Sequence, residues 1–254
     1  MREQRLVFGE DAGLYDEARP SYPSDVVDDV VGLVGAAARG LDVGCGTGKA
    51  TVLLASRGLT GVGVEADPSM AAVARRHLAT TPGWRVDVAD FEAWVPSADS
   101  TPFDLVCSAQ AWHWLDPQVR LDKAHRLLRT GGWLTLWWNR PDGIGSPIRR
   151  DIDEVYHALA PGLTTRGLTS SGPPVVDDVP ADLSFADPVQ RSYAWSASYT
   201  AERWTALLRT QSDHRMLPPD RRELLLRAVG EVIVAHGGVY HHPYVCWLWA
   251  AQKH

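Results

Sequence analysis

Short apolar segments alternate with amphipathic segments over the first 138 residues, and this alternation restricts the possible folds more than any other feature. The apolar runs predict buried strands at residues 40–43, 61–65, 84–88, 103–108 and 133–138. The amphipathic segments predict helices at residues 24–34, 47–57, 67–78 and 116–131. Strands joined by helices of this length pair in parallel with right-handed crossovers, so the first half is predicted to form an open, doubly wound α/β sheet.

The ends of three of these helices carry local signals. Ser24 is predicted to be the N-cap of the first helix, and Asp67 with Pro68 the N-cap and first position of the third. Gly131 and Gly132 are interpreted as the C-terminal stop of the helix that starts at residue 116. These signals fix where the sheet's connections should begin and end.

After residue 139 the regular alternation stops. We predict a helix at residues 148–159, a strand at 189–196, helices at 201–211 and 220–236, and a last strand at 240–250. Residues 161–180 are mostly Gly, Pro, Ser and Thr, a composition that favours a mobile connection or lid over a core element.

Composition and charge exclude several classes of protein. The chain has 254 residues, enough for one large sheet-based domain and a small cap. Its net charge of −6 argues against a surface that binds nucleic acid, and no apolar run approaches the roughly 20 residues of a membrane span. The N-terminus lacks an apolar export signal, and three cysteines without CxxC spacing favour a reducing compartment. We therefore expect a cytoplasmic protein with neither a nucleic-acid nor a membrane partner.

A glycine-rich segment, DVGCGTG at residues 42–48, follows the first predicted strand. Glycines at the carboxyl end of a parallel strand let the backbone turn tightly and approach a ligand closely. The dinucleotide fingerprint G-x-G-x-x-G would need glycine at Lys49, and the P-loop pattern does not occur. Glu65 ends the next predicted strand, where its carboxylate could accept hydrogen bonds from the two hydroxyls of a ribose. The pattern thus favours a nucleoside ligand other than a dinucleotide.

Residues 41–48 with Glu65 resemble the first signature motif of class I S-adenosylmethionine-dependent methyltransferases. Asp90 and Phe91 match the positions where this family holds the adenine ring, and residues 103–114 match its fourth strand and active-site loop. Residues 126–132 resemble the segment that leads into the family's fifth strand. Tyr15, residues 19–23, residues 110–114 and the late helix pair are similar to the bacterial subgroup around trans-aconitate methyltransferase.

This resemblance implies a mostly parallel, seven-stranded Rossmann-like α/β sheet with a small helical cap, in one domain that spans residues 1–254. Within it, residues 1–35 would cover the cofactor, 36–139 would form the cofactor-binding core, 140–187 a lid or insertion, and 188–254 the C-terminal strands with the cap. The implied cofactor is S-adenosylmethionine, with S-adenosylhomocysteine as product, in a monomer or homodimer that methylates a small molecule.

The resemblance also implies the site residues. Tyr15 would close over the methionine end of the cofactor, and Arg19 would meet a carboxylate of cofactor or acceptor. Asp67 lies close to Glu65, but its expected role as an N-cap favours Glu65 as the ribose ligand. The full set of implied cofactor contacts is Tyr15, Arg19, Asp42, Gly44, Cys45, Gly46, Gly48, Glu65, Ala66, Asp90, Phe91, Ser108 and Gln110.

Methyl transfer from a sulfonium is an in-line displacement, for which orientation and exclusion of water can supply much of the rate. A hydroxyl or ammonium acceptor would gain from a general base, whereas a carboxylate needs no base but a cation such as arginine to orient it. In the loop after the fourth strand, Trp112 could stabilise the sulfonium and His113 is the candidate base. The alternative for His113 is a side chain that caps the following helix or bonds the backbone.

Other aromatic residues and a histidine pair are further candidates for a role in the site. Trp112, Trp114 and Trp195 are predicted to line the acceptor pocket, and Trp204 is weighed with Trp195, although core packing is the usual role of such residues. His241 and His242 are adjacent on a predicted strand and point to opposite faces, so we predict no metal site there. Two other functions stay open: a protein that binds S-adenosylmethionine without transferring its methyl group, and an NAD(P)-dependent oxidoreductase.

Overall fold

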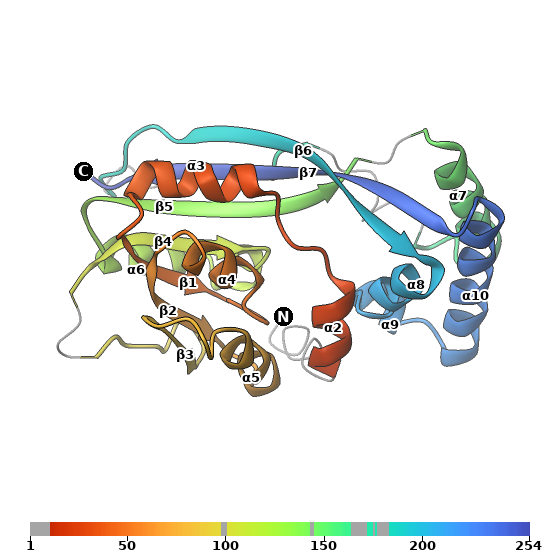
Figure 1. Ribbon diagram of the computed structural model, residues 1–254, viewed down its shortest axis with the longest axis horizontal. Coiled ribbons are helices and arrows are strands. Elements are labelled where there is room, and N and C mark those ends of the chain that lie inside the picture. The colour runs from red at the N-terminus through yellow and green to blue at the C-terminus, as the bar shows by residue number, and fades with distance from the viewer. Residues whose placement is uncertain (1–10, 98–100, 143–144, 164–171, 175, 177–182) are drawn as a thin grey trace.

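Seven strands pair into one sheet in the order β3-β2-β1-β4-β5-β7-β6 in the computed structural model, which describes residues 11–97, 101–142, 145–163, 172–174, 176 and 183–254 (Figure 1). Neighbours from β3 to β5 are parallel, whereas β7 is antiparallel to both β5 and β6. The strands are β1 (Arg39–Val43), β2 (Thr60–Glu65), β3 (Trp84–Val88), β4 (Phe103–Ala109), β5 (Leu128–Pro141), β6 (Val189–Thr200) and β7 (Val239–Gln252). The predicted α/β class, with a mostly parallel seven-stranded sheet, is confirmed.

The helices divide between the two faces of the sheet and a separate group at one end. They are α2 (Ala12–Ala18), α3 (Ser24–Val34), α4 (Lys49–Ala55), α5 (Pro68–His77), α6 (Arg120–Leu127), α7 (Pro147–Leu159), α8 (Ala201–Arg209), α9 (Ser212–Arg215) and α10 (Pro219–Ala235), with a 3-10 turn η2 (Trp112–Trp114). Each helix predicted from periodicity is present. Most of the predicted connection at residues 161–180 lies outside the described residues.

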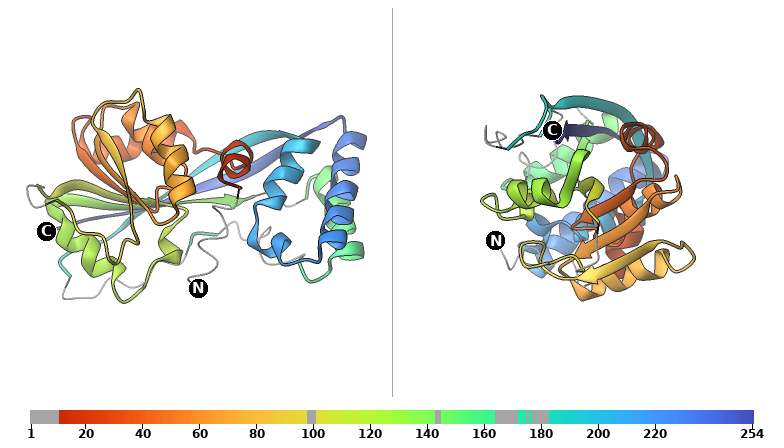
Figure 2. Two further views of the ribbon diagram at one scale, coloured as in Figure 1. Left: turned by 90° about the horizontal axis from the view of Figure 1, so that it is seen from below. Right: turned by 90° about the vertical axis from the view of Figure 1, so that its left-hand side faces the viewer.

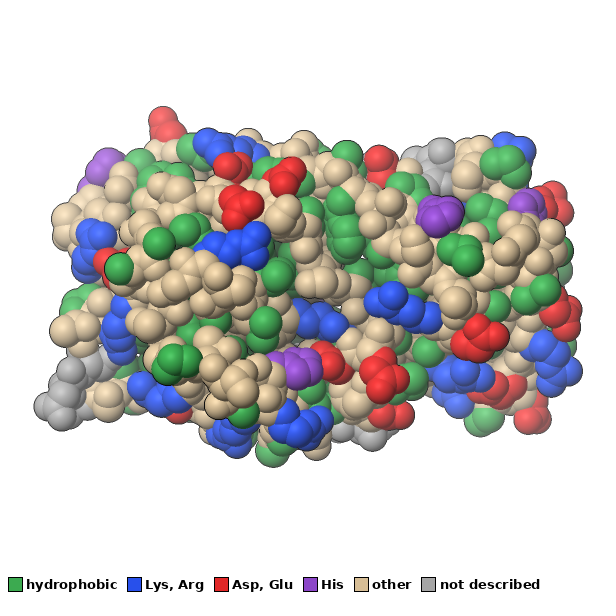
Figure 3. All heavy atoms as spheres, viewed as in Figure 1, with side chains coloured by type: hydrophobic (Ala, Val, Ile, Leu, Met, Phe, Trp, Pro, Cys, Tyr) green, Lys and Arg blue, Asp and Glu red, His purple; other side chains and the backbone are tan. Residues whose placement is uncertain are grey.

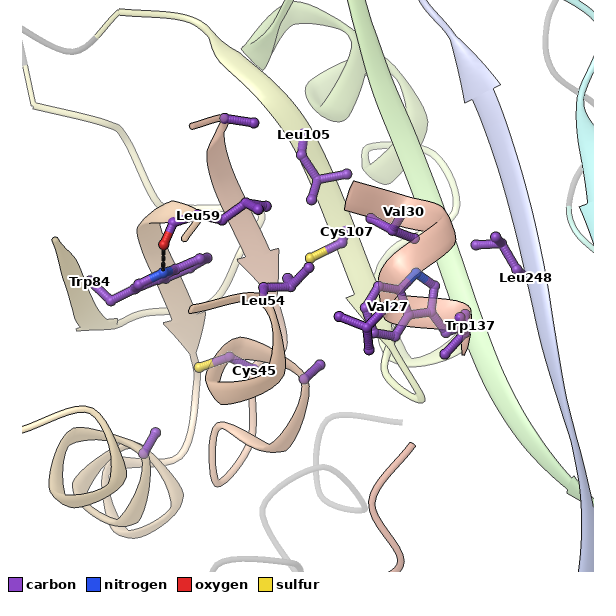
Figure 4. Packing of buried hydrophobic residues seen from close by; sticks show 14 of the residues in the cluster. Val27, Val30, Cys45, Leu54, Leu59, Trp84, Leu105, Cys107, Trp137 and Leu248 are labelled. Atoms are coloured by element: carbon purple, nitrogen blue, oxygen red, sulfur yellow. Dashed lines mark hydrogen bonds between the residues drawn. The ribbon is translucent and has the colours of Figure 1, made fainter. Parts of the chain in front are cut away.

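One hydrophobic core lies between the sheet and helices α3 and α4 (Figure 4). Val27 and Val30 of α3 are fully buried in the same cluster as Trp137 of β5. The indole nitrogen of Trp84 donates a 2.6 Å hydrogen bond to the carbonyl of Leu59, which satisfies the polar atom of this large buried side chain. A second core covers the other face and includes side chains of α6. Burial on both faces explains why the parallel strands read as continuous apolar runs.

Helices α7, α8, α9 and α10, called here the cap, stand beyond the parallel part of the sheet (Figure 1). The long strands β6 and β7 extend into the cap, where Tyr199 and Tyr240 pack with Trp204 of α8 and Leu225 of α10. Helix α2 lies between the two parts and contacts both α5 and α8 (Figure 2, left, red). The chain therefore encloses a space between the carboxyl ends of the parallel strands and the cap.

Two predicted helix ends are wrong. The N-cap of α3 is Pro23, and the Ser24 hydroxyl bonds to Asp25 instead of capping the helix. The helix predicted at residues 116–131 spans only Arg120–Leu127, and Gly131 and Gly132 lie in β5. Gly131 has φ +76°, and its amide donates a 2.7 Å hydrogen bond to the carbonyl of Lys253, so the glycines serve the close pairing of β5 with the end of the chain.

The surface carries acidic and basic side chains close together, without a broad basic region on the face shown in Figure 3. Within the described residues, no helix combines the length and the apolar character needed to cross a membrane.

Candidate active site

A cavity of about 720 Å³ lies at the carboxyl ends of β1, β2 and β4 and reaches into the cap. This volume is in the range of pockets that bind small molecules. The residues that line it on the sheet side and that were predicted from the sequence are Tyr15, Arg19, Asp42, Gly44, Cys45, Gly46, Glu65, Ala66, Phe91, Gln110, Trp112, His113 and Trp114. The structure thus brings most of the predicted site residues to one space.

The glycine loop leaves no room for side chains at two positions. Gly44 has φ +68°, and a Cβ atom there would lie 2.5 Å from the Cβ of Ala111. Gly48 has φ +85° and is the N-cap of α4, where a Cβ atom would lie 3.2 Å from Ala74 of α5. Glycine is needed at both positions because only it combines a left-handed backbone with this close approach.

The carboxylate of Glu65 is held beside the glycine loop by backbone amides. One oxygen accepts a 2.8 Å hydrogen bond from the Gly46 amide and the other a 2.9 Å bond from the Asp67 amide. Burial raises its pKa above the ordinary value, against these hydrogen bonds, which lower it. The Ala66 amide also bonds to this carboxylate, which leaves roughly one of its four lone-pair sites for a ligand hydroxyl. Asp67 caps α5 through the amides of Ser69 and Met70, as predicted, so its carboxylate is already engaged.

Asp42 is fully buried at the floor of the cavity. Its Oδ2 accepts a 2.6 Å hydrogen bond from the Thr51 hydroxyl, and the Cys107 thiol also bonds to the carboxyl group. Oδ1 has no hydrogen-bond partner among the described residues. Burial raises the pKa of Asp42 to about 6. The carboxylate therefore has an unused acceptor atom at a place where a cationic ligand group would stabilise it.

Four predicted site residues do not line the cavity: Gly48, Asp90, Ser108 and Trp195. Ser108 is buried and donates a 2.8 Å hydrogen bond to the carbonyl of Val43, which holds the end of β1. Trp195 stacks on Tyr244 at 5.2 Å and donates to Asn139, so it supports two residues that do line the cavity. Trp204, weighed beside it from the sequence, is the tryptophan that reaches the cavity.

Arg19 joins α2 to the cap. Its Nε donates a 2.8 Å hydrogen bond to the Thr210 hydroxyl, and its Nη2 donates to the Thr210 carbonyl at 3.1 Å. The guanidinium also lies 5.2 Å from the centre of the Tyr15 ring. Both side chains border the cavity, where Arg19 is already bonded within the protein.

The loop after β4 starts with backbone strain. Gln110 has φ +60°, a conformation that costs roughly 1–3 kcal/mol outside glycine and that concentrates at functional sites. The next turn, η2, places the buried Trp112 in the cavity wall, with the Arg120 guanidinium 5.4 Å from its ring centre. The strained backbone thus lies directly before the turn that places an aromatic side chain in the cavity wall.

His113 follows Trp112 on η2 and is accessible within the cavity. Burial, with the nearby charges of Arg140 and Arg120, lowers its pKa to about 4. The N-cap of α6 is Val119 and has no side-chain cap hydrogen bond, so His113 does not cap that helix. The imidazole is therefore neutral at physiological pH, and weakly basic.

Apart from Trp204, the cap side of the cavity is formed by residues that the sequence did not single out as site residues. The cap-side residues come from the end of β5, from α8 and α9, and from β7, and include Asn139, Arg140, Trp204, Gln211, Ser212, Asp213, His242 and Tyr244. Lys49, at the start of α4, is also in the lining. None belongs to a short motif, and only the late aromatic residues gave a signal that could have found some of them.

The histidine pair lies on opposite faces of β7, as its position on a strand predicts. His241 is exposed and bonds to Ser198, whereas His242 is buried. A search of the described part of the chain finds no group of three or more His, Cys, Asp or Glu side chains that could hold a metal ion.

Comparison with known proteins adds to this geometry. Residues 41–136 match the model of a family described as a methyltransferase domain. An uncharacterized methyltransferase of Mycobacterium tuberculosis is 33% identical over 235 residues, which cover 92% of this chain and 88% of the relative. A trans-aconitate 2-methyltransferase of Rhizobium etli is 35% identical over 124 residues, covering 47% of this chain and 44% of that protein.

Among solved structures, the chain is similar to an S-adenosylmethionine-dependent methyltransferase from Thiobacillus denitrificans in complex with S-adenosylhomocysteine. The TM-score is 0.51 at 16% identity, and the match covers 97% of each chain. At this identity the likeness concerns the fold.

Proposed function

Because the chain belongs to the class I S-adenosylmethionine-dependent methyltransferases, we propose that it methylates a carboxylate oxygen of a small acidic molecule. S-adenosylmethionine is the cofactor, as predicted from the glycine loop and Glu65. Our proposal concerns the identity of the acceptor and the role of each side chain. The observation that carries it is Arg140, a cation in the cavity for which the described residues supply no carboxylate partner.

The sheet side of the cavity suits a cationic nucleoside. The buried Oδ1 of Asp42 lacks a partner among the described residues, and Glu65 keeps an acceptor site beside a loop in which side chains would clash. We assign the ribose hydroxyls to Glu65 and the α-ammonium group of the amino-acid end to the region of Asp42, with Phe91 against the adenine ring. Residues 1–35 with α2 would cover this ligand, within a single domain of residues 1–254.

Arg140 lies near the end of β5 and borders the cavity. Its Nε has no hydrogen-bond partner among the described residues. Burial lowers the pKa of the guanidinium, and no carboxylate of the described residues offsets that penalty. A partly buried cation without a counter-ion is unfavourable, so a ligand carboxylate would gain a charge-assisted, bidentate contact here.

Other donors in the same wall also favour an oxygen-rich, anionic acceptor. The indole nitrogens of Trp112 and Trp204 are buried and have no acceptor among the described residues. Buried N–H groups left unpaired are costly, and ligand oxygens would satisfy them. The relative from Rhizobium etli is named for trans-aconitate, itself a carboxylate anion, which agrees with this assignment.

A carboxylate acceptor explains the weak basicity of His113. When bound, S-adenosylmethionine would supply a methyl group on positively charged sulfur: an acceptor oxygen lone pair forms the O–CH3 bond as the S–CH3 bond breaks, and the electron pair of the broken bond stays on the sulfur of S-adenosylhomocysteine. No proton has to leave a carboxylate in this reaction, so no general base is required. Arg140 would orient the acceptor, the Trp112 ring would stabilise the sulfonium by a cation–π interaction, and the cap would exclude water.

The cavity continues past the glycine loop into the cap, which favours methyl transfer over binding of the cofactor alone. Such a binding protein would need no second compartment. The oxidoreductase alternative loses its support with the family match.

Arg140→Met tests the proposal with trans-aconitate as the probe acceptor. Loss of one charge-assisted contact should lower kcat/KM by about 10- to 100-fold, since such a contact contributes roughly 1.5–3 kcal/mol. The dissociation constant of S-adenosylhomocysteine, measured by calorimetry, should stay within about twofold. Arg85→Met, on the exposed side of β3, is the matched control.

The trimethyl ester of trans-aconitate is the neutral analogue in the same assay. It should not compete with trans-aconitate at concentrations near the KM of the acid. Equal activity of wild type and Arg140→Met toward trans-aconitate, or equal competition by the ester, would contradict the proposal.

A further inference from the structure

A chain of hydrogen bonds in the cap ends on a histidine that borders the cavity. Asp153 and Arg149 form an ion pair on α7, with Nε–Oδ1 at 2.9 Å and Nη2–Oδ1 at 2.8 Å. Arg149 bonds in turn to the Tyr240 hydroxyl, which lies 2.8 Å from Nδ1 of His242. Arg149, Tyr240 and His242 are 3%, 1% and 1% exposed. The relay thus runs from the partly exposed Asp153 through the three buried side chains of Arg149, Tyr240 and His242.

The donors and acceptors of this relay fix the position of one proton. A guanidinium can only donate, so the Tyr240 oxygen accepts from Arg149. The hydroxyl has a single proton, and Nδ1 of His242 is the acceptor within reach. Burial, with the charge of Arg149, lowers the pKa of His242 to about 3, so the ring is neutral. A neutral ring that accepts at Nδ1 carries its proton on Nε2.

Nε2 of His242 is left free for a ligand. It has no hydrogen-bond partner among the described residues, and the side chain is part of the cavity wall. The aromatic rings of Trp204 and Tyr244 lie 4.8 Å and 4.5 Å from the imidazole and keep it from rotating. The N–H thus has a fixed direction in a desolvated place.

We propose that His242 is a specificity-determining residue that donates an Nε2–H hydrogen bond to an oxygen of the acceptor, and that Tyr240 and Arg149 are positioning residues that lock its tautomer. The inference rests on the proposed function, because it assigns a second contact to the same acceptor. A neutral N–H group can donate a hydrogen bond to a carboxylate, carbonyl or hydroxyl oxygen, but it cannot bind an ammonium group, which has no acceptor atom.

The strand register separates this contact from Arg140. Arg140 pairs with Val245 on β7, and His242 lies three residues further along that strand. Side chains alternate along a strand, so Arg140 and His242 approach the cavity from opposite faces of the β5–β7 pair. A molecule held by both carries two separate oxygen-bearing groups, such as a dicarboxylate or a tricarboxylate.

The proton position can be read without any acceptor. In protein labelled with 15N-histidine, long-range 1H–15N spectra should show His242 with its proton on Nε2. Tyr240→Phe should shift the ring toward the other tautomer or a mixture of both. A wild-type ring protonated on Nδ1 would overturn the inference outright.

The acceptor contact is tested by kinetics with trans-aconitate. His242→Phe should raise KM about tenfold, with kcat and the dissociation constant of S-adenosylhomocysteine little changed, while His242→Gln, which keeps a donor near Nε2, should stay within about threefold. Tyr193→Phe, which removes a phenol of β6 that bonds to Asp29 and does not line the cavity, is the matched control.

The outcomes separate the inference from the proposed function. Equal KM values for His242→Phe, His242→Gln and wild type would overturn the His242 contact even if Arg140→Met behaves as proposed. A KM effect at His242 with no effect at Arg140 would support the contact and overturn the carboxylate proposal. Absence of trans-aconitate binding to the complex with S-adenosylhomocysteine would overturn both.

Discussion

At the sheet end the cavity wall holds the buried carboxylates of Asp42 and Glu65, together with Lys49, which is paired with Asp16. At the cap end it holds the donors of Arg140, Trp204 and His242, together with Asp213, which is bonded to His214. The two ends thus differ in the sign of charge they prefer. A cationic cofactor and an anionic acceptor would each be drawn to its own end. Under the proposed function, the cavity orients two ligands mainly by opposite electrostatics, with little need for acid–base groups between them.

The two ends also differ in how the chain builds them. Asp42, the glycine loop and Glu65 lie within 24 residues of one another, on β1, β2 and the turn between β1 and α4. The cap end takes side chains from β5, α8 and β7, which are separated by about a hundred residues. One end is a local motif, and the other exists only after the long strands have paired.

The largest expected effect is at the sheet end. Glu65→Ala removes the carboxylate that would bind the ribose and also releases the amides of Gly46 and Asp67. We expect the dissociation constant of S-adenosylmethionine to rise about 100-fold, from the loss of a charge-assisted hydrogen bond of roughly 1.5–3 kcal/mol together with these amide contacts. Isothermal titration calorimetry measures it.

Asp67→Asn is the control for Glu65, because asparagine still caps α5. It should change the dissociation constant by less than threefold. If Asp67→Asn weakens binding as much as Glu65→Ala, the cofactor contact at this end has been assigned to the wrong acid.

A smaller effect is expected where the two ends meet, at His113. With a pKa of about 4 the imidazole is already neutral above pH 5, so its protonation does not limit turnover near pH 7. His113→Ala should lower kcat for a carboxylate acceptor by less than tenfold, against the 10²–10⁴ that a general base contributes. A 10³-fold loss of kcat with unchanged cofactor affinity would support His113 as a general base. It would contradict a site that works mainly by opposite electrostatics at its two ends.

The smallest effect concerns stability at the sheet end. Asp42 has a folded-state pKa of about 6, above its unfolded value near 3.9, so folding favours the protonated form. Its contribution to stability is therefore full below about pH 4 and is lost as the pH rises to about 6. Asp42→Asn keeps an acceptor for Thr51 and should raise the free energy of unfolding by about 2 kcal/mol at pH 8, with little change at pH 4.

Calorimetric melting at both pH values checks this, with an increase in Tm of ~5 °C expected at pH 8 only. Asp104→Asn is the comparison variant, for which we expect a change in stability of the opposite sign. The pKa of Asp104 is lowered by its bonds to the Arg39 amide and to Arg129 despite burial, so that variant should lose stability at pH 8. A drop in Tm for Asp42→Asn at pH 8 would contradict the assignment of an unfavourable buried charge.

The contrast between local and distant parts also explains what the sequence could predict. β3 was predicted to the residue, and Asp67 was identified as a cap, because these signals reside in a few neighbouring side chains. The prediction that Gly131-Gly132 ends a helix was wrong because a glycine pair also permits close strand pairing. The strand that pairs here is more than 100 residues away, so no local signal shows it.

The same reason governs the site. Residues 42–66 could be assigned from one motif, whereas Arg140 and His242 have no motif and depend on how β5 and β7 extend toward the cap. Trp195 and Trp204 were equal candidates by sequence. Only the packing of Trp195 behind Asn139 and Tyr244, and of Trp204 in the wall, tells them apart.

Helix α2 ties these two parts together through short anchors. On one side, Lys49 of the helix after the glycine loop donates to the carbonyl of Asp16 at 2.6 Å, and on the other, Arg19 holds Thr210 at the end of α8. Loosening of the cap by heat or denaturant would pull on the same short helix, which in the proposed function covers the nucleoside. Unfolding of the cap helices and release of the bound ligand thereby become one cooperative event. The enzyme loses its activity before the core of its sheet unfolds.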